Sequence, residues 1–246
     1  MDWRIFHAAF SDNTASTYIL SLFLLIVHKK LNISEVFMTI QHYPFQPVEL
    51  PYDYDALEPF IDARTVDIHY NKHYKGYIDK LNGALKPFPQ YHQWTLKRLI
   101  FECGYLPREI RQTVLRSAGG VLNHELYFYS MCKGKIISPF MSERISACFG
   151  SAENMENRLG EAAESVFGSG YAALIATKCG CLRLVKFSNQ DTSYLQEGFP
   201  LLLIDVWEHA YYLKYTYNRK AYAENWLNLI NWEFAERQYR ELYGER

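Results

Sequence analysis

The sequence predicts an α+β fold with a helical first half and a second half in which helices surround a small antiparallel sheet of about three strands. Three observations lead to this prediction. Apolar residues recur at helical intervals between about 56 and 166. The stretch 170–189 alternates in the manner of strands around a turn-like "KCG". The run "PLLLID" at 200–205 is typical of a short, buried strand.

The first half reads as a series of helices that follow a proline-rich lead-in. Pro44, Pro47 and Pro51 make 42–54 extended, and a helical pattern begins near Ala56. A long helix over 68–81 should end at Gly83 and the following "KPFPQ". Further helices are expected in this order: "QWTLKRLIFE" (93–102), "PREIRQTVLRSA" (107–118) and "VLNHELYFYSMC" (121–132). The pair Gly119-Gly120 is predicted to interrupt the helical pattern between the last two.

The second half is expected to be mixed. A connector around 133–140 should precede helices over 140–149 and 152–166. The predicted strands come next, and the chain turns helical again after Val206. A final helix is expected within "AYAENWLNLINWEFAERQYREL" at 221–242.

Charge and cysteine content exclude some classes of function. The net charge of -1 and the pI near 6.7 give no electrostatic footprint for nucleic-acid binding. The five cysteines are odd in number and include no C-x-x-C pair. Cys179 and Cys181 are too close in sequence for an ordinary bridge to each other. We therefore expect reduced, mostly structural thiols and no disulfide framework.

Residues 1–37 differ in character from the rest of the chain. The apolar run Tyr18 to Val27 has 10 residues, against about 20 for a bilayer span, so no stable membrane span is predicted. No typical cleavage site follows it. We favour Met38 as the natural start, which predicts a cytoplasmic protein. The alternatives are a targeting or anchoring segment of an exported or organellar protein, for which the sequon at Asn32 would matter, and a genuine additional helix.

Five side chains in apolar or aromatic contexts are candidate metal ligands. His69 and His73 share a face of the first long helix, His124 lies on a ring-rich helix, and Asp205 and His209 follow the buried strand. Three imidazoles and one carboxylate suit manganese or iron, and also zinc. Each has a plainer interpretation, since a lone histidine is often a satisfied core residue and Asp205 could cap the next helix. Spacing alone does not bring four of them together. The chain has no H-E-x-x-H motif and no glycine-rich phosphate loop.

The run "DVWEHAYYLKY" at 205–215 closely resembles the signature of the iron/manganese superoxide dismutases. Other segments resemble this family in the family's order: "IHYNKHYKGYIDKLN" (68–82), "AGGVLNHELYF" (118–128), "GSGYAAL" (168–174), "NQD" (189–191) and "NWLNLINWEFAERQY" (225–239). The resemblance covers about 45 to 243. It implies an N-terminal antiparallel helical hairpin domain (38–137) packed on a C-terminal α/β domain (138–246), with 1–37 outside both.

The resemblance also implies a role for individual residues. The metal ligands would be His69, His124, Asp205 and His209, with a solvent molecule as the fifth ligand. Around them, Tyr77 matches the gateway tyrosine, Gln190 the glutamine that hydrogen-bonds the bound solvent, and Trp207 a cavity wall. His73 and Tyr212 match a pair that meets across the dimer interface, and Glu208 matches the interface acid. The implied assembly is a homodimer or tetramer.

The implied reaction is conversion of superoxide to dioxygen and hydrogen peroxide by ping-pong redox cycling of one manganese or iron ion per subunit. The resemblance favours manganese. The family's manganese type takes its active-site glutamine from the sheet region, where Gln190 lies in this sequence. The iron type usually takes its glutamine from the helix, at the position that Gly120 occupies here. Phe128, Tyr171 and Ala173 depart from the tryptophans usual in the family at these cavity positions. Lys72 and Arg219 are candidates for steering the anionic substrate, or plain surface residues.

Two alternatives remain open at this point. One is a catalytically silent relative that keeps the fold as a structural or metal-binding protein. The other is a different metalloenzyme, such as a zinc hydrolase, in which Glu208 would be the only nearby general base.

Overall fold

The computed structural model describes residues 41–196 and 198–244. The apolar run 18–27, the sequon at Asn32 and the proposed start at Met38 lie outside these residues. Within the described ranges, no helix is both long enough and apolar enough to cross a bilayer.

The first long helix is continuous from Ala63 to Leu85 but changes its winding in the middle. An α-helical turn, α2 (Ala63–Ile68), leads into a π-helical segment, η2 (His69–Tyr74), and then into α3 (Lys75–Leu85). Asp62 caps its start by accepting a hydrogen bond from the backbone N–H of Thr65 at 2.9 Å. The sequence pattern did not predict the π segment, and the helix continues past Gly83 to Leu85.

Helix α5 (Arg108–Tyr129) corrects the prediction of a break at Gly119-Gly120, because it runs unbroken through both glycines. A Cβ at Gly119 would lie 2.1 Å from the carbonyl oxygen of Gln190, and a Cβ at Gly120 would lie 2.6 Å from the ring of Tyr77. Because neighbouring segments approach the helix this closely, glycine is needed here for space. Helix α4 (Leu96–Phe101), capped by Thr95, precedes α5.

Three strands form the predicted antiparallel sheet: β1 (Gly170–Thr177), β2 (Leu182–Ser188) and β3 (Gly198–Asp205), in the order β2-β1-β3. The central strand β1 pairs with β3 in a register that sets Tyr171 opposite Asp205. The end of β3, where the first predicted ligand of the second half lies, therefore meets the beginning of β1.

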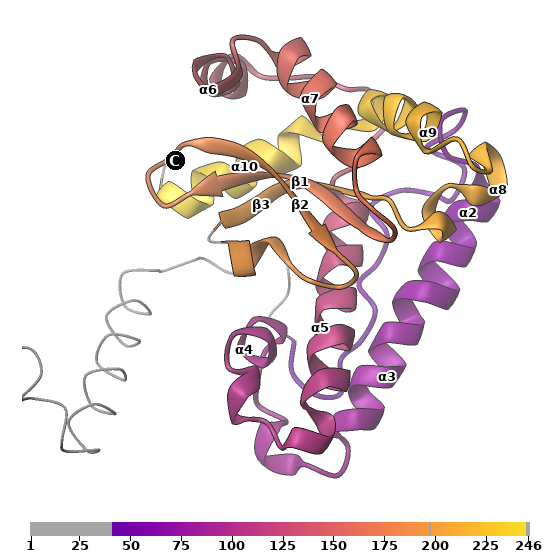
Figure 1. The fold of residues 1–246 in the computed structure, drawn as a ribbon, viewed down its shortest axis with the longest axis vertical. Helices are drawn as coiled ribbons and strands as arrows, with labels where there is room; N and C mark the ends of the chain where they lie inside the picture. Colours follow the sequence, from indigo (N-terminus) through magenta and orange to yellow (C-terminus); the bar gives the residue numbers. More distant parts are fainter. Residues whose placement is uncertain (1–40, 197, 245–246) are drawn as a thin grey trace, which may run out of the picture. The chain divides into compact units, whose positions relative to one another are not determined.

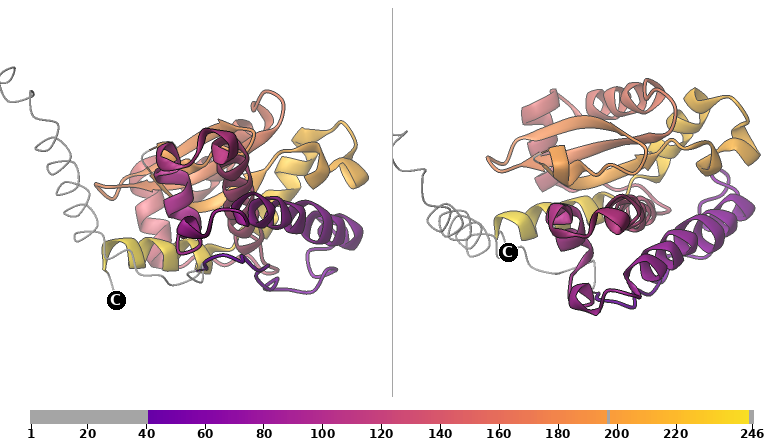
Figure 2. Two further views of the ribbon diagram at one scale, coloured as in Figure 1. Left: turned by 90° about the horizontal axis from the view of Figure 1, so that it is seen from below. Right: turned by 60° about the horizontal axis from the view of Figure 1, so that its bottom comes forward.

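Helices cover both faces of this sheet, as Figures 1 and 2 show. On one face lie α6 (Pro139–Phe149) and α7 (Ala152–Glu164), and on the other lie α5 and α10 (Trp232–Tyr243). The core between them is rich in rings; Trp226, Trp232 and Tyr127 are among its largest fully buried side chains. These layers confirm the α+β fold, with a helical N-terminal part and a three-stranded sheet in the C-terminal part.

The final helix predicted over 221–242 is in fact two helices. Helix α9 (Arg219–Trp226) and a 3₁₀ turn end before Ile230, which adopts an extended conformation and forms an isolated bridge with Met131. Asn231 then caps α10 by accepting from the N–H of Phe234 at 3.1 Å. A short helix, α8 (Tyr212–Tyr215), precedes α9. The 3₁₀ turn after α9 is Leu227–Leu229. The other 3₁₀ turns in the described ranges are Pro89–Tyr91, Cys103–Tyr105, Ser193–Gln196 and Glu208–Ala210.

Candidate metal centre

Four side chains from four separate elements converge in the interior. They are His69 from the π segment, His124 from α5, Asp205 from the end of β3 and His209 from the 3₁₀ turn that follows. Each directs one ligand-capable atom inward, and these atoms all lie within 4.8 Å of one another. The structure therefore brings together the four residues singled out in the sequence, which spacing alone did not.

The inward atoms of this cluster have no hydrogen-bond partner. Nε2 of all three histidines and Oδ2 of Asp205 are buried and unsatisfied. Leaving so many buried polar atoms unpaired is costly, at roughly 1–3 kcal/mol each. Ligand bonds of about 2.1 Å to one ion would set opposite ligand atoms about 4 Å apart, so a cluster of this size fits a single metal ion.

The histidine rings are fixed in orientation by the surrounding structure. Nδ1 of His124 lies 2.6 Å from the carbonyl oxygen of Gly120, one turn earlier in α5. As a donor there, Nδ1 carries the ring proton and leaves Nε2 as a free lone pair. The ring of His69 lies edge-on between those of His124 and His209, with centroids 4.9 and 4.7 Å away. Each ring thus presents Nε2 to the common centre.

Asp205 is the anionic member of the cluster and is fully buried. Its Oδ1 accepts a hydrogen bond from the backbone N–H of Trp207 at 2.8 Å, which leaves Oδ2 facing His69 at 3.3 Å and His209 at 3.6 Å. Burial opposes its ionisation, but the close approach of the His209 and His69 rings to Oδ2 outweighs burial and holds the pKa of Asp205 below its usual value. The carboxylate is therefore charged at neutral pH.

Burial lowers the pKa of the buried histidines, whereas the negative charge of Asp205 raises it. Burial is the larger influence and lowers the pKa of both His69 and His124, and the mutual repulsion of the rings adds to this effect for His124. Neutral imidazoles are the form that binds a metal ion. The site thus offers three neutral nitrogen ligands and one carboxylate, a set suited to manganese, iron or zinc.

A chain of hydrogen bonds lies beside the cluster and joins residues far apart in sequence. Gln190, in the loop after β2, donates from Nε2 to the hydroxyl oxygen of Tyr77 on α3 at 2.9 Å. Its Oε1 accepts from the hydroxyl of Tyr171 at 2.9 Å and from Asn123 at 3.5 Å. The ring of Tyr77 lies 5.3 Å from that of His124, so this chain ends at the cluster.

Aromatic rings form the wall around the ligands. Phe128 is buried, with its ring centroid 5.3 Å from that of His69. The indole of Trp207 lies nearly parallel to the ring of His209 at 5.6 Å, and its Nε1 donates to the carbonyl oxygen of Asn189 at 3.1 Å. Ala173 lies buried within the sheet, opposite Val185 and Leu203.

The three residues expected at a subunit interface lie at or near the surface of the single chain. His73 is partly buried and stacks on His209 with centroids 3.9 Å apart. Glu208, one residue before His209, is exposed. Tyr212 is 50% exposed, and its neighbour Leu213 is 52% exposed.

The two cations considered in the sequence differ in their surroundings. Arg219 donates hydrogen bonds to the carbonyl oxygens of Val166 and Gly168, which is a structural role. Lys72 is exposed. Lys80, which sequence reasoning missed, holds its ammonium group 5.5 Å from the ring centroid of Tyr77. The sequence offered one signal for this contact, because Lys80 lies one turn after Tyr77 on the predicted helix and so shares its face.

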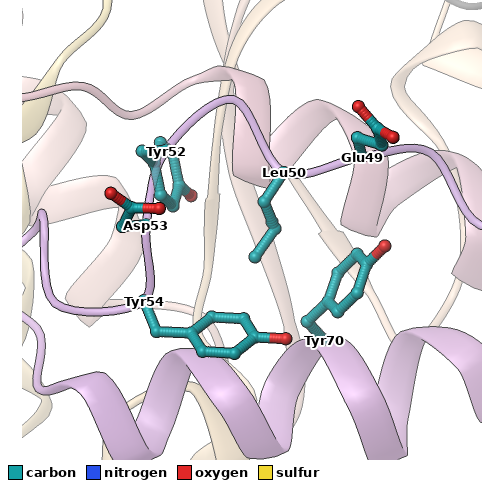
Figure 3. Close-up of a pocket in the computed structure, with 6 residues that line it drawn as sticks. All are labelled: Glu49, Leu50, Tyr52, Asp53, Tyr54 and Tyr70. Carbon is teal, nitrogen blue, oxygen red and sulfur yellow. The ribbon is translucent and has the colours of Figure 1, made fainter.

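A separate surface pocket of about 260 Å³ adjoins the lead-in segment and does not contain the cluster. Its lining residues are Glu49, Leu50, Tyr52, Asp53, Tyr54 and Tyr70. In Figure 3, Leu50 lies between the rings of Tyr54 and Tyr70. Tyr70 donates a hydrogen bond to the carbonyl oxygen of Val48 at 2.7 Å and so ties the lead-in segment to the π segment.

Two family models match this chain and together span most of it. Residues 44–132 match the α-hairpin domain of the iron/manganese superoxide dismutases, and residues 138–238 match the C-terminal domain of the same family.

Curated relatives match over nearly their full lengths. A manganese superoxide dismutase of Thermus thermophilus is 37% identical over 201 residues, which is 81% of this chain and 98% of the relative. One from Thermus aquaticus is 38% identical over 80% of this chain and 98% of its own length. One from Escherichia coli O157:H7 is 39% identical over 77% of this chain and 95% of its own length.

Proposed function

The chain belongs to the iron/manganese superoxide dismutase family, and from that membership we propose that it converts superoxide to dioxygen and hydrogen peroxide at the four-residue cluster. The observation that carries the proposal is the set of four buried, unpartnered ligand atoms that converge within 4.8 Å. Such a set is costly to maintain without an ion.

We assign His69, His124, Asp205 and His209 as the ligands of one metal ion. A bound manganese or iron ion supplies one-electron redox chemistry, alternately oxidising one superoxide and reducing another. With a divalent or trivalent ion held there, the single negative charge of Asp205 would leave the site net positive, which would favour approach of an anionic substrate.

The chain's own residues handle protons in this proposal. Burial raises the pKa of the Tyr77 hydroxyl, so the group stays protonated at neutral pH. Its oxygen accepts from Gln190, which leaves its own O–H free to donate toward a reduced oxygen species in the cavity. Gln190 is fixed by Tyr171, so the amide cannot rotate and reverse this polarity.

Manganese is the metal that we propose in this protein. The relatives described above are named as manganese enzymes. Gln190 approaches from the loop after β2, and Gly120 has no side chain with which to compete, one turn before His124. A glutamine at position 120 would collide with the ring of Tyr77, since even a Cβ would come within 2.6 Å.

We also propose a homodimer, or a tetramer built from dimers, that covers the exposed side of the cluster. Tyr212 and Leu213 leave large apolar areas exposed next to Glu208, an exposed carboxylate that precedes the ligand His209 and has no ion pair among the described residues. A second copy of the same surface would bury the apolar groups, and the two-fold arrangement would bring each Glu208 to the other subunit's site.

Two domains, 38–137 and 138–246, remain our proposal for the organisation; the separate matches to 44–132 and 138–238 support it. We propose that Met38 is the start of the native protein and that it is cytoplasmic, with export through the segment 1–37 as the alternative. N-terminal sequencing of protein from its native source tests this, because cleavage after the apolar run would place the start elsewhere.

The proposed function is tested by metal analysis and superoxide consumption on the same preparation. We expect about one manganese or iron ion per subunit and activity proportional to metal content. Full loading with manganese or iron but no superoxide consumption would instead support the silent relative. Full zinc occupancy with hydrolysis would support the zinc hydrolase.

A further inference from the structure

The turn between β1 and β2 carries two exposed cysteines whose sulfurs are in contact. Cys179 and Cys181 flank Gly180, and their Sγ atoms lie 3.4 Å apart. The turn lies at the opposite end of β1 from the Tyr171–Asp205 pair, so it is separate from the metal centre.

Hydrogen bonds within the turn and from α10 hold it in place. Gly180 has φ of 84°, and its N–H donates to the carbonyl oxygen of Thr177 at 2.9 Å. Helix α10 anchors the turn, because Tyr239 donates to the carbonyl oxygen of Gly180 at 3.1 Å and Tyr243 donates to that of Thr177. The two cysteines therefore lie on a turn whose backbone is held at Thr177 and Gly180.

The two thiols have different acidities. The hydroxyl of Thr177, 3.1 Å from the sulfur, is the main cause that lowers the pKa of Cys179 to about 7, and hydrogen bonds from the N–H and thiol of Cys181 add to it. The same proximity raises the pKa of Cys181. Because a thiolate is the reactive form, Cys179 is suited to attack and Cys181 to act second.

We propose that Cys179 and Cys181 form a peroxide-oxidisable dithiol that closes reversibly to a disulfide across the β1–β2 turn. The Cys179 thiolate attacks one oxygen of hydrogen peroxide; an S–O bond forms, the O–O bond breaks, and hydroxide leaves and is protonated to water. The Cys181 thiol then gives its proton to the departing hydroxide as its sulfur displaces it from Cys179, forming the S–S bond. Two thiols and one peroxide yield one disulfide and two waters.

The site favours disulfide formation because a second thiol lies next to Cys179, and not because Cys179 attacks peroxide much faster than other cysteines. At pH 7 a pKa of about 7 raises the thiolate fraction roughly 15-fold over an ordinary thiol. Lower basicity reduces the intrinsic nucleophilicity roughly fivefold, so attack is only about threefold faster. The contact with Cys181 then captures the sulfenic acid before it reacts elsewhere.

The bridge should be easy to reduce again. Its sulfurs must close from 3.4 Å to about 2.05 Å within a three-residue segment whose backbone is held on α10. Strained and exposed disulfides are the labile ones, so a low-molecular-weight thiol restores the pair by exchange. The inference rests on the proposed function for its oxidant, since hydrogen peroxide is the product of that reaction.

The test is a peroxide titration of the metal-loaded protein, followed by alkylation with N-ethylmaleimide and tryptic mass spectrometry. Cleavage after Lys178 and Arg183 releases both cysteines in one peptide, 179–183. We expect the alkylatable thiols to fall from five to three, with peptide 179–183 unalkylated and lighter by two hydrogens. A reductant should restore five. Persistence of both thiols in that peptide while other cysteines oxidise would overturn the proposal.

Two variants separate the roles of the sulfurs. Cys181→Ser should leave a sulfenic acid at Cys179 that dimedone captures, about threefold faster than at other cysteines. Cys103→Ser, a change at a partly buried cysteine on another element, should leave the disulfide unaffected. A bridge from Cys181 to Cys148, whose sulfur accepts from the N–H of Leu182, would contradict the proposed pairing. Because peroxide is added directly, these results are independent of superoxide consumption, which is measured separately.

Discussion

Gln190 donates a hydrogen bond from Nε2 to the hydroxyl oxygen of Tyr77 at 2.9 Å, joining the loop after β2 to helix α3 across 113 positions of sequence. The other side of the amide is held by Tyr171, so the orientation of Gln190 depends on two tyrosines from different elements. The proposed proton donor, Tyr77, is therefore positioned by Gln190 and Tyr171. Neither of these two side chains is hydrogen-bonded to one of the four proposed ligands.

We predict that Gln190→Ala lowers superoxide turnover by about 10- to 100-fold, because Tyr77 loses its donor and Tyr171 loses its acceptor. Tyr171→Phe should have a smaller effect, costing about 1 kcal/mol of stability, since Gln190 keeps Asn123 as a partner at 3.5 Å. Turnover per bound metal ion and the free energy of unfolding measure the two effects. An equal loss of turnover in both variants would show that the orientation of Gln190 depends wholly on Tyr171.

Metal binding should depend on Asp205. We predict that Asp205→Ala reduces occupancy to below about one tenth, because it removes the only anionic ligand atom of the cluster. The control is Glu224→Gln, which removes an exposed carboxylate on α9 and should retain the metal. Metal analysis after identical purification measures this, and full occupancy in Asp205→Ala would refute the proposed ligand set.

Removal of the metal from the unaltered protein should lower its stability. An ion at 100 times its dissociation constant contributes about 2.7 kcal/mol, which for a chain of this size corresponds to about 5–10 °C in Tm. Calorimetry with and without a chelator measures the shift. Equal Tm values in the two states would contradict the view that the unpartnered Nε2 and Oδ2 atoms are a binding site.

Lys80 offers a test of substrate steering. Its ammonium group lies 5.5 Å from the ring centroid of Tyr77, where a positive charge favours approach of an anion. We predict that Lys80→Gln lowers kcat/KM about two- to fivefold at low ionic strength, with the difference fading as salt screens the charge. Lys86→Gln, at an exposed position at the end of the same helix, is the comparison. An unchanged salt dependence in Lys80→Gln would exclude the steering role.

Stability should also vary with pH through Glu125. Burial raises the pKa of this carboxyl to about 7, although a hydrogen bond from Tyr74 at 2.8 Å partly opposes the shift. Because the folded-state pKa lies above the unfolded value, the stabilising contribution is complete below pH 4.5 and is lost as the pH rises to about 7. The loss amounts to about 3 kcal/mol.

Unfolding in urea between pH 4.5 and 8 measures this dependence, and Glu125→Gln should flatten it. The group acts in a different pH window from Asp205, whose pKa is lowered and whose contribution is lost only on the acid side of its usual value. A slope that persists unchanged in Glu125→Gln would assign the titration to another group.

The sequence predicted the presence of helices and strands better than it predicted where they begin, end or continue. Periodicity located the strands and most helices, because burial of one face repeats along each element. It failed where a contact with a distant segment decided the local structure. Ile230 leaves the helical path to pair with Met131, and Gly119-Gly120 lies within an unbroken helix against which Gln190 and Tyr77 pack closely. None of these three partners lies within a local sequence window.

The candidate site shows the same limit. Its ligands were recognised from a resemblance in motifs, whereas the hydrogen bond from Tyr171 to Gln190 and the position of Lys80 beside Tyr77 required the structure. Tyr171 supplies its hydroxyl at a position where the resemblance in motifs leads to the expectation of a tryptophan. The geometry that this hydroxyl adopts depends on the pairing of β1 with β2 and on the loop after β2.

Gly119 and Gly76 are two helical glycines with different surroundings, and their alanine variants test whether position 119 needs glycine for space. A Cβ at this position would lie 2.1 Å from the backbone carbonyl oxygen of Gln190, and backbone cannot move aside as a flexible side chain can. We predict that Gly119→Ala destabilises the fold by about 1–3 kcal/mol and lowers turnover by displacing Gln190 from Tyr77. Gly76→Ala is the matched control, because Gly76 is also helical and its Cβ would have no neighbour within 4 Å. That change should stabilise the protein by about 0.4–1 kcal/mol with turnover unaltered. Stabilisation of both variants would show that position 119 does not need glycine, either for space or for catalysis.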